Sequence, residues 1–338
     1  MTAPPATALS RALRAFFSDY LPRLQGLSPH TLHSYRDGLT LLLRFMASQR
    51  RLSVAQLDLV HIEAEEVIAF LDHLEQQRHN SIATRNVRLA ALHAFFRYVA
   101  VNDPEQLSRS QRILCIPFKR AGQRPIEYLE YAEIAAVLTG IDRSTQQGRR
   151  DYALLATMFN SGARVQELLD IRACDLQLTK PFQVRLVGKG RKERLCPLWP
   201  QTAALLRDLC TEIQLDPRAP VPVFRNQRGQ PLTRFGVRYI LAKHVDRMRP
   251  TVPTLKDKRL HPHSVRHSTA VHLLKSGVDL STIGQWLGHR SVNTTNRYAT
   301  VDLDMKRQAL ADADPPAEAP SAPNWRKDQA ILEWLEAL

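Results

Sequence analysis

The chain has 338 residues, and its 47 lysines and arginines outnumber its 33 aspartates and glutamates, which gives a net charge of +14 at pH 7. That length suggests about two domains, and a 44% share of hydrophobic residues excludes a disordered polybasic chain. No apolar run reaches the roughly 18 residues of a membrane span, and the start lacks the pattern of a signal peptide. The four cysteines show no C-x-x-C spacing. We therefore expect a folded basic protein of the reducing cytosol, without a membrane partner or a disulfide framework.

The type and placement of the basic residues narrow the class of partner. Arginine outnumbers lysine 37 to 10, and residues 126–310 hold most of the positive charge. A guanidinium group matches two phosphate oxygens, whereas an ammonium group is a point charge. Nucleic acid or polyphosphate is therefore the leading partner, and a solvated basic face is the alternative that charge alone leaves open.

The first hundred residues have the pattern of a small helical bundle. Ser28 and Pro29 supply an N-cap and a first helical position, and apolar residues then recur at helical spacing to about Gln49. Two further apolar faces, within 67–74 and 87–99, complete the bundle. Residues 103–125 break this periodicity with prolines and a Ser/Arg/Gln stretch, which predicts a linker.

Beyond the linker, a mainly helical domain with one hairpin is predicted. Apolar and polar residues alternate from Phe182, glycines turn the chain near 188–190, and Leu195 begins the return strand. Helices are expected at about 201–213, 233–248, 263–275, 281–287 and 303–311. We expect an N-terminal domain over 1–102, a linker over 103–125, a second domain over 126–311, and over 312–338 a Pro/Ala-rich linker with an amphipathic helix.

Separated segments carry residues suited to phosphodiester cleavage without a metal ion. Such cleavage needs donors for two non-bridging oxygens, a nucleophile, and an acid for the departing oxygen. Arg164 and Arg266 could be the donors, and His263 shares a helix face with Arg266. Lys189, between two glycines of the hairpin, could donate the proton, and the phenol of Tyr298 could attack phosphorus.

The ordered set of motifs resembles the tyrosine recombinases, the family of phage integrases, Xer-type resolvases and Cre. The resemblance covers roughly residues 9–311 and rests on the motifs GARVQEL, VGKGRKER, HPHSVRH, LGH and NRY. It implies the catalytic residues Arg164, Lys189, His263, Arg266, His289 and Tyr298, with Glu167 in support. It also implies a helical core-binding domain and a catalytic domain with a small sheet, which clamp duplex DNA. Val265 departs from the leucine usual in the box, and the tail extends beyond the usual end.

By this resemblance, Tyr298 attacks the scissile phosphate and forms a 3′-phosphotyrosyl link without a cofactor. His263 and His289 would hydrogen-bond to the phosphate and manage the proton of Tyr298, and Lys189 would protonate the 5′ oxygen. Candidate DNA contacts are Arg85, Arg88, Arg191, Lys192 and Arg194. The partner would be duplex DNA with a specific recombination site. A tetramer on paired sites is expected through the C-terminal segment, with other recombinases as further partners.

Other interpretations remain open at this point. Residues 279–298 fit a helix-turn-helix regulator that cleaves nothing, and a type IB topoisomerase uses the same tyrosine chemistry. His263 and His267 have the spacing of a helical zinc pair, with His261, His272 or His289 as third ligand, although no H-E-x-x-H arrangement is present. The ordered set favours a recombinase that acts in integration, excision, resolution or transposition of a mobile element.

Overall fold

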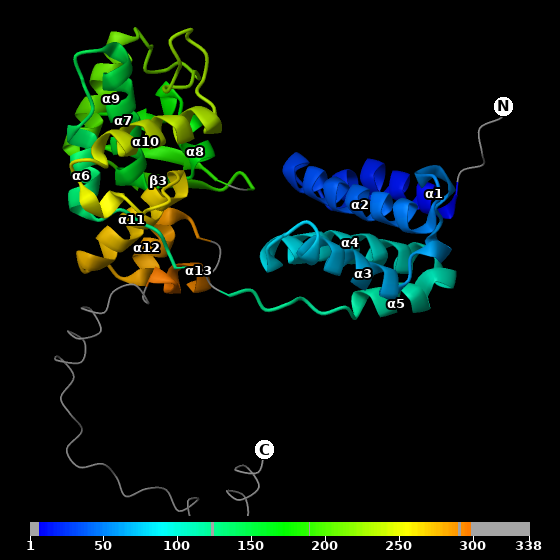
Figure 1. The fold of residues 1–338 in the computed structure, drawn as a ribbon. Helices are drawn as coiled ribbons and strands as arrows, with labels where there is room; N and C mark the ends of the chain where they lie inside the picture. Colours follow the sequence, from blue (N-terminus) through cyan, green and yellow to red (C-terminus); the bar gives the residue numbers. More distant parts are fainter. Residues whose placement is uncertain (1–6, 123–124, 189, 290–291, 299–338) are drawn as a thin grey trace, which may run out of the picture. The chain divides into compact units, whose positions relative to one another are not determined.

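The computed structural model describes residues 7–122, 125–188, 190–289 and 292–298. The chain divides between residues 124 and 125 into two compact units, each with its own hydrophobic core (Figure 1). Helices dominate both units, and a three-stranded sheet lies in the second, so the predicted mainly α class is confirmed. Within the described ranges, no helix combines the length and hydropathy that a bilayer span requires.

The N-terminal unit is a helical bundle. Its elements are α1 (Ala8–Ala15), a π-helix η1 (Phe16–Leu24), α2 (Pro29–Arg50), 3₁₀ turns η2 (Val54–Gln56) and η3 (Leu59–His61), α3 (Ala64–Gln76), α4 (Ile82–Asn102), η4 (Pro104–Gln106) and α5 (Leu107–Leu114). The Ser28 side chain accepts a hydrogen bond from the backbone N–H of Thr31, and Pro29 follows at the first helical position. The predicted start of this helix is therefore confirmed.

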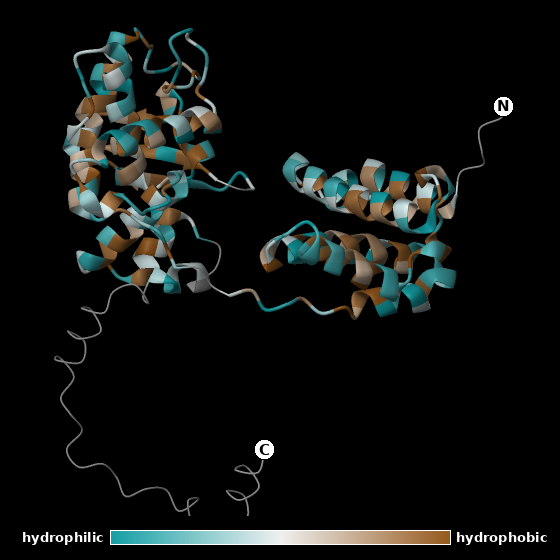
Figure 2. Ribbon diagram, in the orientation of Figure 1, coloured by the Kyte–Doolittle hydropathy of each residue, from teal (hydrophilic) through white to brown (hydrophobic). Residues whose placement is uncertain are grey.

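Close packing of α2 against α4 forms the centre of this bundle. A Cβ on Gly38 of α2 would lie 3.2 Å from the Cβ of Ala91 on α4, so glycine lets the two backbones approach. Phe16 packs edge to face against Phe95 at 5.3 Å between ring centroids. Figure 2 shows hydrophobic and hydrophilic stripes on these helices, as expected of an amphipathic bundle.

The segment 103–125, expected to be a linker, contains helix α5. Ile113 and Ile116 are buried in the core of the N-terminal unit, although their neighbours are polar. Nε of Arg109 donates to Oε1 of Glu63 over 2.8 Å. Because Glu63 is the N-cap residue of α3, this bond ties the polar stretch to the start of that helix. Two apolar residues and the ion pairs of Arg109 and Arg112 with Glu63 thus hold a helix whose composition alone resembles a loop.

In the second unit, the buried helix α7 (Gln146–Ser161) lies among the other helices and the sheet. Its helices are α6 (Tyr131–Thr139), α7 (Gln146–Ser161), α8 (Val165–Leu169), η5 (Ala173–Asp175), α9 (Pro200–Glu212), α10 (Arg234–Met248), η6 (Pro253–Leu255), α11 (Pro262–Lys275), α12 (Leu280–Leu287) and α13 (Val292–Asn296). Helix α7 packs against both α9 and α11, and most of its residues are buried. The helix that precedes the motif GARVQEL is thus fixed by the core.

The sheet is antiparallel in the order β1 (Leu176–Gln177), β2 (Gln183–Val187) and β3 (Glu193–Pro197). Val184 pairs with Cys196, and Val187 pairs with Glu193 at the end that leads into the turn. The predicted hairpin is confirmed, but the short strand β1 was not predicted, because two residues are too few to show an alternating pattern.

Replacing Gly148 with alanine is expected to lower the free energy of unfolding of the second unit by about 3 kcal/mol. Its Cβ would lie 1.7 Å from the carbonyl oxygen of Asp142, a backbone atom that cannot simply rotate away. Gly236 of α10 is a matched control, since both glycines are the third residue of a helix with a threonine N-cap. A Cβ on Gly236 meets its nearest atom at an ordinary 3.6 Å. Thermal unfolding of both variants tests this; equal stabilities would contradict it.

Candidate active site

The turn between α7 and α8 forms the first part of the site. Gly162 ends α7 with a φ of 57°, and a Cβ here would lie 2.5 Å from Cδ2 of Leu287, so the turn requires glycine. Arg164 follows at the N-cap of α8. Its Nη1 donates to Oε1 of Glu167 over 2.7 Å, and its backbone N–H donates to Oε2 of Glu167 over 3.0 Å. The Arg164 side chain remains 38% exposed and can therefore reach a substrate.

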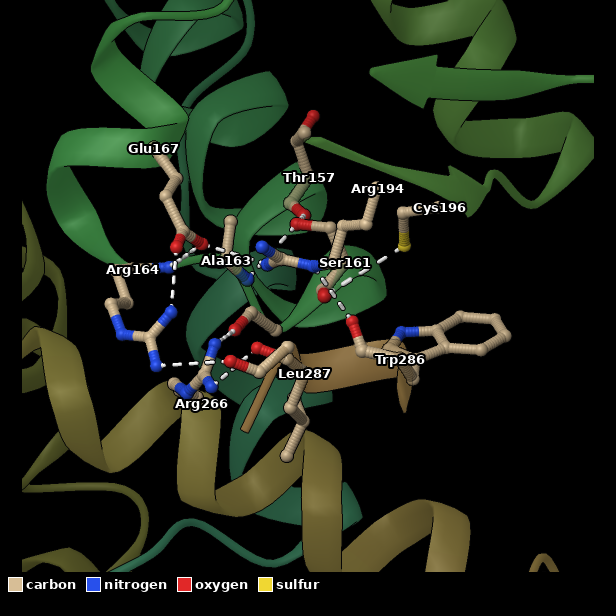
Figure 3. Close-up of polar contacts among 12 residues, drawn as sticks. Thr157, Ser161, Ala163, Arg164, Glu167, Arg194, Cys196, Arg266, Trp286 and Leu287 are labelled. Carbon is tan, nitrogen blue, oxygen red and sulfur yellow. Dashed lines mark hydrogen bonds and ion pairs between the residues drawn. The ribbon is translucent and has the colours of Figure 1, made fainter. Parts of the chain in front are cut away.

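Glu167 is a buried carboxylate that joins two arginines. Its Oε2 also accepts a hydrogen bond of 2.7 Å from Nη2 of Arg194 on β3 (Figure 3). Nε of Arg194 donates in turn to the carbonyl oxygen of Trp286 over 2.9 Å, which ties the sheet to the end of α12. Burial alone would raise the pKa of Glu167, but the hydrogen bonds and charges of Arg194 and Arg164 outweigh burial and lower it. The carboxylate is therefore ionised at neutral pH.

Arg266 is the most deeply buried cation of the site, with 1% of its surface exposed. Its Nη1 donates to the carbonyl oxygen of Gly162 and its Nη2 to that of Leu287, each over 2.6 Å. Figure 3 shows its guanidinium group beside that of Arg164, although the two come from different helices. Burial and the charge of Arg164 lower the pKa of Arg266 to about 10, so it stays charged at neutral pH. Two cationic forks thus gather at one place.

Tyr298 lies at the same site, with only 2% of its surface exposed. Its phenolic oxygen is 2.8 Å from Nδ1 of His267, a hydrogen bond between the chain after α13 and α11. The ring of His289 stacks on the Tyr298 ring, with centroids 6.2 Å apart and an interplanar angle of 14°. Burial raises the pKa of Tyr298, and the nearby charges of Arg266 and Arg297 oppose that rise. The phenol is therefore protonated in the DNA-free protein.

The histidines around Tyr298 differ in their hydrogen-bond partners and in their exposure to solvent. Nδ1 of His289 is 2.8 Å from Oγ1 of the buried Thr295, which leaves Nε2 of that ring for another partner. His263 lies exposed in the first turn of α11, with its ring 4.7 Å from that of His267 in an edge-to-face arrangement. Partial desolvation and the charge of Arg266 lower the pKa values of His263 and His289 to about 4. Both rings are therefore neutral at pH 7.

The structure thus brings together most of the residues that the sequence suggests for catalysis. These are Arg164, Glu167, His263, Arg266, His289 and Tyr298. Lys189 lies outside the described residues, but a Cβ on its neighbour Gly188 would be 3.1 Å from Oε1 of Glu167. The tail 312–338 and the expected helix 303–311 also lie outside the described part of the chain.

His267 and Thr295 contact site residues directly and were not suggested as members of the site. The signal for His267 was its place directly after Arg266 and four residues after His263. That i, i+4 spacing was interpreted as a possible zinc pair, whereas Nδ1 of His267 faces the phenol of Tyr298. Among the described residues, no three His, Cys, Asp or Glu side chains are grouped so as to hold a metal ion.

Two of the candidate DNA contacts are engaged inside the protein instead. Arg85 is 4% exposed, lies 3.1 Å from Glu75 and donates to the carbonyl oxygen of Pro117 over 3.3 Å. Arg194 is equally engaged with Glu167 and has a side chain only 13% exposed. Each guanidinium group is occupied by internal acceptors, so neither presents a free surface charge to a phosphate.

The remaining candidates for DNA contact differ in exposure. Arg88 is half-buried, and its Nη1 donates to the carbonyl oxygen of Ser34 over 3.3 Å. Arg191 and Lys192 are exposed in the turn between β2 and β3. Of the predicted DNA contacts, Arg191 and Lys192 are therefore the two whose exposure suits contact with a DNA phosphate.

Comparisons with known proteins agree across both units. The model of the phage integrase family matches residues 127–304, and that of its N-terminal SAM-like domain matches residues 15–101. The tyrosine recombinase XerC of Pelobacter propionicus is 31% identical over 92% of this chain and 98% of its own length. The chain belongs to the phage integrase family of tyrosine recombinases.

A further relative of this recombinase is the integrase/recombinase-type protein y4rC of Sinorhizobium fredii, which is 38% identical over 98% of each chain. The XerH site-specific recombinase, solved with a palindromic difH substrate, shares the fold with a TM-score of 0.66 at 23% identity, over 83% of this chain and 79% of that one. The Tn1549 transposon integrase, solved with DNA, has a TM-score of 0.64 at 16% identity, over 88% and 98%.

Membership of the family makes this chain a DNA strand-transfer enzyme of site-specific recombination. The helix-turn-helix regulator and the type IB topoisomerase are therefore not supported. The structure also places residues of this segment at the site: the His289 and Tyr298 rings, which follow α12 and α13, stack on each other. Arg266 and Arg164 donate to the carbonyl oxygens of Leu287 and Gly288, directly before His289.

In this recombinase, Glu167→Gln is expected to lower the free energy of unfolding at pH 7 by about 1–3 kcal/mol, since a neutral amide cannot replace both charge-assisted bonds. The folded pKa lies below the ordinary glutamate value of 4.5, so the stabilisation is present above that value and is lost as pH falls through the folded pKa. The gap between the two proteins should therefore shrink in acid.

Thermal unfolding measured from pH 7 downward tests this expectation. Glu193→Gln is the matched control, because Glu193 is 55% exposed and pairs with Arg185 at 3.3 Å on the surface. Its effect should stay within about 0.5 kcal/mol. If the stability lost in Glu167→Gln were the same at every pH, the shape of the Glu167 side chain, and not its charge, would be what stabilises the protein.

Proposed function

We propose that Tyr298 is the nucleophile that cleaves one DNA strand, with attack of its phenolic oxygen on the scissile phosphorus. A 3′-phosphotyrosyl bond forms, the bond from phosphorus to the 5′ oxygen breaks, and the link stores the energy for rejoining. The observation that supports this most is the position of Tyr298 itself. Its buried phenol lies among the charges of Arg266 and Arg164, which come from separate segments.

Arg164 and Arg266 would bind the non-bridging oxygens and stabilise the charge that develops on them. Arg266 is pre-positioned by two carbonyl groups, and Arg164 by Glu167, so little reorganisation is needed on substrate binding. His263 and Nε2 of His289 would donate further hydrogen bonds to the same oxygens. Lys189 would protonate the 5′ oxygen, and no cofactor is required for this exchange of phosphodiester bonds.

Duplex DNA would be held by both domains, the N-terminal core-binding domain, whose core includes residues of α5 and the turn after it, and the catalytic domain over 126–311. Exposed Arg191 and Lys192 would contact phosphates. The exposed face of α10 is a further DNA-contacting surface in this proposal. Phe235 and Tyr239 are 84% and 67% exposed beside the exposed Arg238, and base edges in a groove offer partners to both kinds of side chain.

The working assembly would be a tetramer on two paired sites, in the cytoplasm. The segment 312–338 would link neighbouring subunits, and other recombinases would join the assembly. The biological reaction would be the integration, excision, resolution or transposition of a mobile element. Truncation after Ala313 is the direct test of the tail, since it should spare DNA binding by a single subunit but impair recombination between two sites.

The proposed chemistry is tested by covalent capture. Protein is incubated with randomised DNA duplexes that carry a nick, so that the short 5′-hydroxyl fragment diffuses away after cleavage and cannot be rejoined. Adducts that survive denaturation are recovered, and sequencing of their DNA yields the preferred site. The expected result is a protein–DNA adduct on a defined sequence; DNA binding without any adduct would overturn the proposal.

A further inference from the structure

Of the histidines near Tyr298, His267 is the one placed to exchange a proton with the phenol. Its Nδ1 lies 2.8 Å from the phenolic oxygen, a distance typical of a direct hydrogen bond. His289 presents the face of its ring to Tyr298, and its own Nδ1 is occupied by Thr295. His263 contacts the ring of His267 and is exposed. Geometry therefore distinguishes three residues that the sequence alone does not separate.

We propose that His267 is a catalytic residue that takes the phenolic proton of Tyr298 during strand cleavage and returns it during rejoining. This inference rests on the proposed function of Tyr298. As the bond from the phenolic oxygen to phosphorus forms, the phenolic proton passes to Nδ1 and the ring becomes an imidazolium. The bond to the 5′ oxygen breaks at the same time, and that oxygen leaves with the electron pair and takes a proton from the acid, Lys189.

Rejoining reverses each transfer. A 5′-hydroxyl attacks phosphorus and loses its proton to the same acid, the bond to the phenolic oxygen breaks, and that oxygen recovers its proton from Nδ1 of His267. Because one ring serves both directions, the enzyme ends each cycle in its starting protonation state. This symmetry suits a reaction that exchanges one phosphodiester bond for another.

The charges around His267 explain why the proton would move only when DNA is bound. Burial, then His263 and Arg297, lower the pKa of His267 to about 3, so its ring is neutral and free to accept a proton at pH 7. His261 and Arg266 also face it, and both oppose protonation. A bound phosphate would offset the positive charges of Arg266 and Arg297 and stabilise the imidazolium. The base is therefore ready before DNA arrives but becomes effective beside the scissile phosphate.

The test measures single-turnover adduct formation on the duplex recovered by covalent capture. His267→Asn keeps a hydrogen-bond acceptor near the position of Nδ1 but cannot be protonated. It should cleave about 10²–10³-fold more slowly, on the scale of a lost general base, with DNA affinity near that of the unchanged protein. His272→Asn is the matched control on the same helix, because His272 stacks on Tyr131 and lies against Phe159. It should cleave at the normal rate.

The pH dependence separates proton transfer from mere positioning. Without a base, attack depends on the small fraction of phenolate, so the rate of His267→Asn should rise about tenfold per pH unit toward alkaline pH. The unchanged protein should show a much flatter profile. A normal rate in the variant would overturn the proposal, and so would a slow rate with a flat profile. Should the asparagine variant not fold, His267→Gln is measured by the same criteria.

A measurement without DNA keeps this inference separate from the proposed function. Nitrogen-15 NMR of histidine-labelled protein reports which ring nitrogen of His267 carries the proton, and the inference requires a bare Nδ1 with the proton on Nε2. A proton on Nδ1 would overturn it even if adducts form. If the unchanged protein forms no adduct on any duplex, the proposed function of Tyr298 fails. The NMR result still reports separately whether His267 has the protonation that this inference requires.

Discussion

Tyr298→Phe is expected to abolish the covalent protein–DNA adduct completely. The substitution removes one oxygen, the atom that would bond to phosphorus, and leaves the stacked ring beside His289 in place. Loss of the hydrogen bond to His267 should cost only about 1 kcal/mol of stability. DNA binding should therefore stay near normal, while adducts disappear from a denaturing gel.

Tyr152→Phe provides the control, since Tyr152 packs at the core of the same unit with Arg143 over its ring. Its adduct yield should match that of the unchanged protein. Adduct formation should also persist in EDTA, because guanidinium groups supply the positive charge at the phosphate. Adducts that form at the normal rate in the Tyr298 variant would show that another side chain attacks the DNA.

Arg266→Ala should produce two separate losses. Cleavage at saturating protein should fall by about 10²–10³-fold, the scale of losing one donor to a transition-state oxyanion, with DNA affinity changed much less. Stability should fall as well, by about 2–4 kcal/mol, because the buried carbonyl groups of Gly162 and Leu287 lose their donors. Cleavage is read from single-turnover adduct formation, and stability from thermal unfolding.

Comparison with Arg164→Ala separates the two losses. The Arg164 side chain is 38% exposed, and its partner Glu167 keeps the bond from Arg194, so this variant should lose cleavage with a smaller loss of stability. Arg266→Lys should keep part of both, since an ammonium group cannot donate in two fixed directions. If cleavage and DNA affinity of Arg266→Ala fell by the same factor, Arg266 would be an ordinary phosphate anchor.

Two arginines that were predicted to contact DNA bind acceptors inside the protein instead. Arg194 was expected at the DNA, yet it joins β3 to Glu167 and to the end of α12. Arg85 is likewise paired with Glu75 inside the N-terminal unit. A guanidinium group that could bind phosphate equally satisfies a buried carboxylate, and the sequence does not say which acceptor reaches it.

The sequence by itself determined those features that depend on neighbouring residues along the chain. Helix periodicity, the Ser28 cap, the hairpin around its glycines and each short motif such as GARVQEL are all local patterns. Local patterns survive without knowledge of the fold, because a cap or a turn is made by residues within a few positions of one another.

Only the tertiary structure decided which of these residues touch. Tyr298 and His267 are 31 positions apart, and Arg266 and Gly162 are 104 apart, yet each pair shares a hydrogen bond. Helix α5 forms because distant residues cover its apolar side, although its own composition is polar. The burial of a side chain and its hydrogen-bond partners depend on which distant segments the core brings together, so they follow from the tertiary structure. For that reason the contact between His267 and Tyr298 could not be predicted, although His267 directly follows Arg266 in the sequence.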